Sequence, residues 1–221
     1  MPIFTVKEIL EATGGRLIRG EDSAVVQGVS IDTRTIRPSE LFIAVPGPNF
    51  DGHDFIAQAV EKSAAAIIIC KKSFSVKPQI PVILVPDPVQ ALGRIAQYHR
   101  RRFPVEIIAV TGSAGKTTTK EMIASVLEAK YRVLKNTATE NNHIGVPLTP
   151  LKLDFSHQVA VIEFGTNRFG DIRWLTAITH PTAVLFTNIG ESHLEFLKTP
   201  AGVLSASKCD SPILVKMAMS G

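Results

Sequence analysis

The chain has 221 residues, 45% of them hydrophobic and 20% charged, and carries a formal net charge of +4. These proportions argue against a disordered chain, and the longest apolar run, residues 64–70, is far shorter than the roughly 20 residues of a membrane-spanning helix. The first residues show no secretory signal, so we expect a cytoplasmic globular protein of one or two domains in which Cys70 and Cys209 are free thiols.

Helical and strand patterns alternate along the first half of the chain. Apolar residues recur at helical spacing over residues 6–13, and Gly14 ends that pattern. Residues 55–62 form a second helical pattern, which Asp54 can cap. The other predicted elements are strands over residues 41–45, 66–70 and 81–85 and a helix over residues 87–102. This alternation predicts a compact α/β domain over residues 1–102.

A second α/β pattern starts after this domain. Residues 105–110 are typical of a buried strand, and a glycine-bearing turn and a helix over residues 116–129 follow it. Two more apolar strands are predicted over residues 159–164 and 183–187. Their unbroken apolar character is typical of a parallel sheet covered on both faces, so we expect a second domain over residues 103–221. The predicted helix should pack through its apolar residues Met122, Ile123, Val126 and Leu127.

The densest basic cluster is the run from His99 to Arg102 at the end of the first predicted domain. No aromatic residues alternate with these basic ones, as a surface that stacks single-stranded nucleic acid would require. We therefore interpret the run as a solvated helix end and expect no nucleic-acid partner.

The most informative segment is a loop of small residues between a predicted strand and a predicted helix. Small residues let backbone N–H groups converge on an anion, and the helix N-terminus adds the positive end of its dipole. In this pattern Lys116 would reach the β- and γ-phosphates and the Thr117 hydroxyl would bind Mg²⁺, although Val110 stands where the full motif has its first glycine. The predicted phosphate-binding residues are Thr111, Gly112, Ser113, Ala114, Gly115, Lys116, Thr117 and Thr118.

Polar residues follow the other two predicted strands of this domain. Glu163 ends an apolar strand, where a carboxylate is costly unless it is paired or binds a metal. Beside a phosphate loop we favour a Mg²⁺ ligand over a capped strand end. Asn188 and His193 follow the next strand, at the sheet edge where open α/β folds bind ligands.

Four segments in this order resemble the Mur ligases, the enzymes that build the peptide stem of peptidoglycan. They are the phosphate loop and the segments 141–149, 161–167 and 187–195. Upstream, the segments 32–34 and 50–55 resemble the UDP-sugar-binding domain of the same family. The resemblance covers about residues 1–206, and segment 141–149 is most similar to the members that add D-alanyl-D-alanine.

The resemblance implies a small N-terminal α/β domain that binds the UDP-muramyl substrate, followed by a P-loop-type central ATPase domain with a mostly parallel sheet. It implies ATP and Mg²⁺ as cofactors, and Asn188 as a nucleotide contact. The implied catalytic residues are Lys116, Glu163 and His193, and the implied metal ligands are Thr117, Glu163 and His193. The implied contacts to the UDP-muramyl substrate are Thr33, Arg34, His53, Asn141 and Asn142, of which the two asparagines are also ordinary turn formers.

The implied reaction is ATP-dependent amide formation through an acyl phosphate. The partners would be UDP-N-acetylmuramoyl-tripeptide, D-alanyl-D-alanine and ATP, bound by a monomer without membrane attachment. Alternatives at this stage are a diamino-acid-adding Mur ligase, a folylpolyglutamate-type ligase, a P-loop NTPase or kinase with an added domain, and a non-catalytic nucleotide-binding module.

The sequence departs from the family pattern in three places. Thr139 stands where the D-alanyl-D-alanine-adding members usually have asparagine, and Lys208 comes one position later than the lysine that family members carbamylate. On a helix one position is a rotation of about 100°, which would aim the side chain elsewhere. The C-terminal domain of the family is absent, and the tail from Ser207 no longer resembles it. We therefore expect a truncated or frame-altered form that binds its ligands but does not ligate.

Overall fold

The computed structural model describes residues 2–71, 78–137, 139–165, 170–188 and 214–216. The chain divides into two compact units, residues 1–98 and 99–221. The sequence placed the boundary at residue 102, whereas this division falls inside helix α3 (Pro88–Arg100). No helix within the described ranges is long and apolar enough to cross a membrane.

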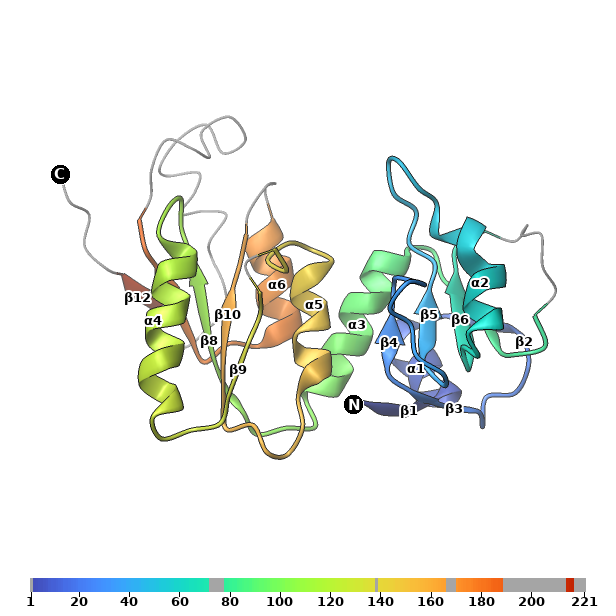
Figure 1. Cartoon of the computed structure of the whole chain (residues 1–221), viewed down its shortest axis with the longest axis horizontal. Coiled ribbons are helices and arrows are strands. Elements are labelled where there is room, and N and C mark those ends of the chain that lie inside the picture. The colour runs from blue at the N-terminus through green and yellow to red at the C-terminus, as the bar shows by residue number, and fades with distance from the viewer. Residues whose placement is uncertain (1, 72–77, 138, 166–169, 189–213, 217–221) are drawn as a thin grey trace. The chain divides into compact units, whose positions relative to one another are not determined.

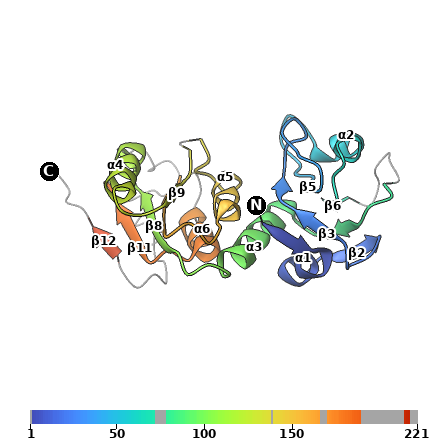
Figure 2. The ribbon, with the colours of Figure 1, turned by 60° about the horizontal axis from the view of Figure 1, so that its bottom comes forward.

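The first unit is built on a five-stranded sheet with the strand order β2-β7-β6-β5-β4. Strands β4 to β7 run parallel, and β2 pairs with β7 antiparallel at the edge. Figure 2 shows α1 and α2 on opposite faces of this sheet. The strands of the sheet are β2 (Arg16–Arg19), β4 (Val29–Ser30), β5 (Leu41–Ile43), β6 (Ala66–Ile69) and β7 (Val82–Leu84). The other elements of the unit are β1 (Ile3–Thr5), α1 (Val6–Thr13), β3 (Val25–Gln27), the 3-10 helix η1 (Gly52–Phe55) and α2 (Ile56–Glu61).

Local capping explains where the first helices begin and end. The Thr5 side chain accepts from the backbone N–H of Glu8, the Glu8 carboxylate accepts from the N–H of Thr5, and Gly14 ends α1 with a positive φ of 67°. The prediction that Asp54 caps the second helix was wrong. Asp51 caps instead, accepting from the N–H of His53, because a 3-10 turn precedes α2.

The second unit is built on an all-parallel sheet with the strand order β12-β11-β8-β10-β9. The prediction of a parallel sheet from unbroken apolar strands is confirmed. The strands are β8 (Glu106–Thr111), β9 (Val133–Lys135), β10 (Val159–Glu163), β11 (Ala183–Phe186) and β12 (Leu214–Lys216). The helices are α4 (Lys116–Glu128), α5 (Gly145–Leu148), the 3-10 helix η2 (Pro150–Lys152) and α6 (Asp171–Thr179).

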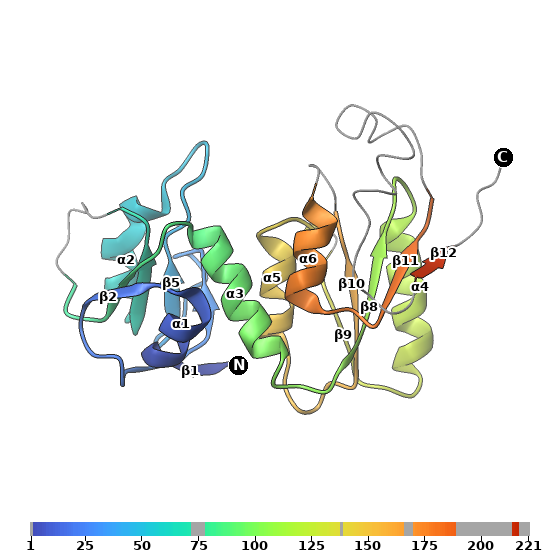
Figure 3. The same cartoon turned by 180° about the vertical axis from the view of Figure 1, so that it is seen from behind.

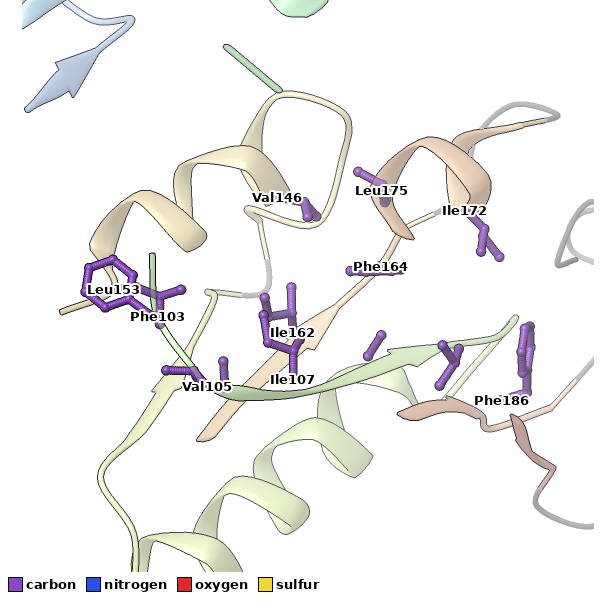
Figure 4. Close-up of a cluster of buried hydrophobic side chains, with 13 residues drawn as sticks. Phe103, Val105, Ile107, Val146, Leu153, Ile162, Phe164, Ile172, Leu175 and Phe186 are labelled. Carbon is purple, nitrogen blue, oxygen red and sulfur yellow. The ribbon is translucent and has the colours of Figure 1, made fainter. Parts of the chain in front are cut away.

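Alternate residues of the central strands supply two separate cores, so the sheet is covered on both faces. Ile162 of β10 belongs to a core with residues of α5 and α6, which Figure 4 shows, whereas its neighbour Val161 packs under α4. Figure 1 shows these strands between α4 and the pair α5 and α6. Burial of each such side chain contributes about 1.5–3 kcal/mol.

The predicted packing face of α4 needs correction. Ile123 and Leu127 pack against the sheet, as expected, but Met122 and Val126 are 65% and 75% exposed. The buried side of the helix instead passes through Lys120 and Ala124, which share helical spacing with Ile123 and Leu127.

The basic run at the end of α3 is not a fully solvated helix end, as the sequence suggested. Arg100 is buried, and its guanidinium donates to the carbonyls of Thr179, Phe103 and Val105. His99 is buried as well, and its Nε2 lies 3.1 Å from the carbonyl oxygen of Leu153. These two residues therefore hold the start of the second unit together.

Candidate functional site

The strand order of the second unit creates a ligand-binding edge between β8 and β10. These strands are parallel neighbours, but α4 follows β8 on one face of the sheet and α6 follows β10 on the other. Figure 3 shows β8, β10 and β11 ending at the same edge, where α4 starts. Open α/β sheets bind ligands where neighbouring connections diverge in this way.

Glycine is required at one position of the loop between β8 and α4. Gly112 has a φ of 135°, and a Cβ there would lie 2.3 Å from the Thr187 Oγ1 and 2.8 Å from the Asn188 carbonyl oxygen. Gly115 has a φ of 77°, but a Cβ there would meet nothing within 4 Å. The first glycine therefore allows a close approach to the end of β11, while the second only permits the turn.

The residues after β11 hold the loop in place. The Thr187 Oγ1 donates to the Ala114 carbonyl at 2.5 Å, and the Asn188 Oδ1 accepts from the Ala114 N–H at 2.8 Å. The Asn188 carbonyl also accepts from the Ser113 N–H at 3.2 Å. Asn188, which the resemblance assigned to the nucleotide, thus contacts the loop itself, and the sequence analysis gave no role to Thr187.

Helix α4 begins at the loop without a side-chain cap. Gly115 occupies the N-cap position, so the first N–H groups of this 13-residue helix receive no side-chain acceptor. The Lys116 ammonium reaches back over the loop and donates to the Gly112 carbonyl at 2.7 Å. Exposed N–H groups, a helix dipole and a lysine converge here, which is the arrangement that binds phosphate groups. Thr118 is exposed in the first turn.

Glu163 ends β10 beside this helix start and is 2% exposed. Its Oε2 accepts from the Thr117 hydroxyl at 2.8 Å, and its Oε1 accepts from the Asn141 Nδ2 at 2.9 Å. Both partners are neutral, and no lysine, arginine or histidine among the described residues pairs with this carboxylate. A buried carboxylate that lacks a cationic partner is costly.

These residues fit a divalent cation. The Glu163 carboxylate and the Thr117 hydroxyl are adjacent oxygen donors, the ligand type that Mg²⁺ prefers, and a cation would supply the missing charge. No group of three or more histidine, cysteine, aspartate or glutamate residues within the described ranges could hold a metal. Phosphate oxygens and water commonly supply further ligands to Mg²⁺ at nucleotide sites.

The two asparagines before α5 have different surroundings. Asn141 contacts Glu163 through its Nδ2, and its carbonyl accepts from the Gly165 N–H at 2.6 Å. The Asn142 Oδ1 accepts from the N–H groups of Ile144 and Gly145 and so forms the turn into α5. The structure therefore brings Asn141 to the Glu163 carboxylate and gives Asn142 a role in the turn. Thr139 lies within 3.4 Å of the Thr137 hydroxyl.

His193, the predicted second metal ligand, lies outside the described residues. The same is true of Ser207, Lys208 and Cys209. The roles that the resemblance gives to His193 and Lys208 stay predictions.

In the first unit, the predicted substrate contacts lie on loops that follow parallel strands. Thr33 and Arg34 follow β4, and His53 lies in η1 after β5. Thr33 is buried, its hydroxyl donates to the Gln58 Oε1, and its carbonyl accepts from the Lys62 ammonium at 2.7 Å. Arg34 is exposed and pairs with Asp32, which lowers the pKa of that carboxyl. Gln58 in α2 and Lys62 directly after it, the two partners of Thr33, were not predicted from the sequence.

His53 is held by protein groups on both ring nitrogens. Its Nδ1 lies 2.6 Å from the Asp51 Oδ1, and its Nε2 accepts from the Cys70 N–H at 3.1 Å. Lys71 and then His53 lower the pKa of Asp51, whereas burial raises the pKa of the Cys70 thiol. The thiol is free, as predicted for Cys70, and it lines a shallow pocket of about 450 Å³ with Leu84 and other residues of this unit.

Comparison with known proteins agrees with this geometry. Residues 25–100 match the family described as "Mur ligase family, catalytic domain", and residues 110–209 match the "Mur ligase middle domain". The UDP-N-acetylmuramoyl-tripeptide–D-alanyl-D-alanine ligase of Bacillus subtilis is 40% identical over 203 residues, covering 91% of this chain and 44% of that protein. The Escherichia coli ligase of the same name is 37% identical, with coverages of 91% and 44%.

Solved structures give the same result. The crystal structure of MurF from Acinetobacter baumannii matches with a TM-score of 0.85 and 32% identity, over 94% of this chain and 46% of that one. MurF from Thermotoga maritima in complex with ADP matches with a TM-score of 0.77 and 32% identity, over 87% and 46%. The chain thus spans less than half the length of these relatives.

Proposed function

The chain belongs to the Mur ligase family, and from this premise we propose that it carries the substrate-binding and ATP-binding parts of a ligase that joins D-alanyl-D-alanine to UDP-N-acetylmuramoyl-tripeptide. The observation that carries the proposal is the buried Glu163 carboxylate beside the Thr117 hydroxyl at the start of α4. The names of the relatives support the choice of dipeptide over the amino acids that the alternative ligases add.

The second unit binds the nucleotide in this proposal. The N–H groups at the start of α4 and the Lys116 ammonium hold the phosphates of ATP, because together they offer donors and positive charge at one point. Thr187 and Asn188 keep the loop in shape by their contacts with Ala114. The ADP complex of the related Thermotoga maritima protein supports a nucleotide at this fold.

Thr117 and Glu163 hold Mg²⁺ in this proposal, and His193 joins them as the family resemblance implies. The bound ion neutralises negative charge on the phosphate groups. Asn141 keeps one oxygen of Glu163 occupied, so the other oxygen remains directed toward Thr117. The carboxylate thereby faces the phosphate loop.

The reaction proposed for the whole ligase, of which this chain carries the substrate-binding and ATP-binding parts, is phosphoryl transfer followed by amide formation. The terminal carboxylate of the muramyl tripeptide attacks the γ-phosphorus of ATP, and the bond from that phosphorus to the β,γ-bridging oxygen breaks, which yields an acyl phosphate and ADP. The amine of D-alanyl-D-alanine then attacks the acyl carbon, loses a proton and expels inorganic phosphate. Lys116 stabilises charge on the transferring group, and the loop positions it.

The carboxyl edge of the first unit binds the UDP-muramyl substrate in this proposal. Thr33, Arg34 and His53 share that edge because β4 and β5 are parallel neighbours. In the second unit, Asn141 and Asn142 are the proposed contacts to the muramyl peptide. The chain acts as a cytoplasmic monomer, which light scattering of the purified protein would check.

A thermal-shift experiment on the full chain tests the proposal. UDP-muramyl tripeptide and Mg-ATP should each raise the melting temperature, since a ligand that binds the native state alone stabilises it, whereas folate and nucleic acid should not. Lys116→Ala should abolish the Mg-ATP shift and leave the UDP-substrate shift intact. Lys130→Ala, at an exposed lysine of the same unit, is the matched control and should keep both shifts. Absence of both shifts in the unchanged chain would contradict the proposal.

A further inference from the structure

Asn136 lies directly after β9, at the point where the backbone pairing of β9 with β10 ends. The register runs from Val133 opposite Val159 to Lys135 opposite Val161 and goes no further. Beyond this register, the side chain of Asn136 replaces the backbone of β9 as the partner of β10. Its Oδ1 accepts from the Glu163 N–H at 2.8 Å, and its Nδ2 donates to the Glu163 carbonyl at 3.0 Å. One buried amide thus pairs with both polar groups of the Glu163 backbone.

The same amide also fixes the segment that carries the other partner of the carboxylate. The Asn136 Nδ2 donates to the Glu140 carbonyl at 2.9 Å, and Glu140 directly precedes Asn141. Asn141 in turn donates to the Glu163 Oε1. Asn136 therefore holds two backbone segments. One is that of Glu163, and the other is that of Glu140, next to Asn141, which donates to the Glu163 carboxylate.

A buried lysine connects Asn136 to the helix of the phosphate loop. Lys120 lies one turn after Lys116 on α4 and is 1% exposed. Its Nζ donates to the Asn136 carbonyl at 2.6 Å and pairs with the Glu121 carboxylate at 3.0 Å. Burial of a lysine is costly, so its placement against Asn136 indicates a fixed connection between α4 and the end of β9.

We infer that Asn136 is a positioning residue: it sets the direction of the Glu163 carboxylate toward Thr117, and Lys120 fixes Asn136 to α4. The inference rests on the proposed function, because it concerns the same metal-nucleotide site. β8 pairs with the end of β10 on one side, but on the side of β9 the N–H and carbonyl of Glu163 are held by Asn136. Without Asn136 this side of the strand end is released, and we expect the carboxylate and the Thr117 hydroxyl, 2.8 Å apart, to separate. Mutation of groups that orient metal ligands typically lowers metal affinity by about 10–100-fold.

The test is the metal dependence of ADP binding by the full chain. Fluorescence titration with a labelled ADP gives one dissociation constant with saturating Mg²⁺ and one with a chelator, and their ratio measures the contribution of the metal. In Asn136→Ala the ratio should fall about tenfold or more, while the constant in chelator stays within about twofold of the unchanged chain. Asn136→Ser keeps a hydroxyl that can donate or accept, and should recover part of the ratio.

The control is Leu153→Ala, a cavity in the apolar core that α5 and α6 cover. It should lower the melting temperature without changing the ratio, which separates positioning from general loss of stability. An unchanged ratio in Asn136→Ala would overturn the inference, as would an equal loss of affinity in both buffers. If Asn136→Ala does not fold, the ratio in Asn136→Ser decides by the same criterion. Failure of the unchanged chain to bind ADP in either buffer would instead refute the proposed function, and the inference with it.

Discussion

Both units of this chain place polar loops at the carboxyl ends of parallel strands, but their carboxylates differ in whether they have cationic partners. In the first unit Asp32 pairs with Arg34, and Asp51 pairs with both Lys71 and His53. In the second unit Glu163 has only hydroxyl and amide partners among the described residues. A cation is therefore expected at the second sheet edge, while charge at the first is already balanced within the protein.

The carboxylates of the two units also differ in burial, which increases the expected difference in their contributions to stability. The side chains of Asp32 and Asp51 are 32% and 24% exposed, and ion pairs at such positions contribute only about 0–1 kcal/mol. Glu163 is 2% exposed, and a buried carboxylate without a cation costs several kcal/mol. Stability in the second unit is thus lower without a ligand than its packing alone would give, which is typical of binding sites.

The largest effect on the metal dependence of ADP binding is expected from Glu163→Gln. The amide removes the negative charge, so the gain in ADP affinity from Mg²⁺ should disappear, a loss of about tenfold or more. Thermal stability without ligand should stay equal or rise, because the unpaired buried charge is gone. Calorimetric titration and a melting curve measure the two effects. A fall in both would contradict the contrast between the units.

The largest effect on stability is expected at the glycines of the phosphate loop. Gly112→Ala places a Cβ against Thr187 at a φ of 135°, so we expect a loss of about 2–5 kcal/mol in the free energy of unfolding, together with loss of ADP binding. Gly115→Ala, where a Cβ meets nothing, is the matched control and should cost about 1–2 kcal/mol. Urea denaturation measures both, and equal costs would show that the approach to β11 does not matter.

The buried histidine His99 should make the stability of the second unit depend on pH. Burial lowers the pKa of His99, so the unfolded chain binds its proton more readily. The stability that neutral His99 confers is complete above its unfolded pKa of about 6.5 and is lost as pH falls toward the lower folded value. The pKa of the exposed His180 is lowered too, by partial desolvation and by the nearby Arg101 and Arg100. The decline of Tm from pH 7 to pH 5 should therefore be smaller in His99→Phe, and an unchanged slope would refute this.

The smallest effect is expected from Asp51→Asn in the first unit. The lowered pKa of Asp51 means that its stabilisation is present above about pH 4 and is lost as pH falls toward the folded value. Because the pair with Lys71 is partly exposed, the loss at pH 7 should be about 1 kcal/mol or less. Its sign is opposite to that expected for Glu163→Gln, and chemical denaturation of both variants compares them directly.

Much of the fold followed from local patterns. The helix predicted over residues 6–13 is α1 with the same bounds, and the strand of residues 159–164 is β10 within one residue. Between α4 and β11 only β10 was predicted. β9 has three residues and α5 has four, too few for a periodic signal, whereas α6 (Asp171–Thr179) is long enough for one and was missed.

The site residues that directly follow or end an apolar strand could be predicted from the sequence. Lys116, Thr117 and Glu163 come together because β8 and β10 are neighbours in the sheet. The sequence predicts each of these strands, but only the structure establishes that they are adjacent. Asn136 was missed because it is 27 residues away from Glu163 in the sequence. Its side-chain amide also takes the place of a backbone partner for Glu163, which no sequence pattern indicates. The signal for Lys120 was present: a lysine at helical spacing with Ile123, Ala124 and Leu127.

The central claim is that the buried carboxylate and the phosphate loop form one Mg²⁺-nucleotide site. The most direct measurement is isothermal titration of the unchanged full chain with ADP, once with Mg²⁺ and once with a chelator. We predict one ADP per chain, bound more tightly by about tenfold or more when Mg²⁺ is present than in chelator. Binding with equal affinity in both buffers, or no binding in either, would contradict it.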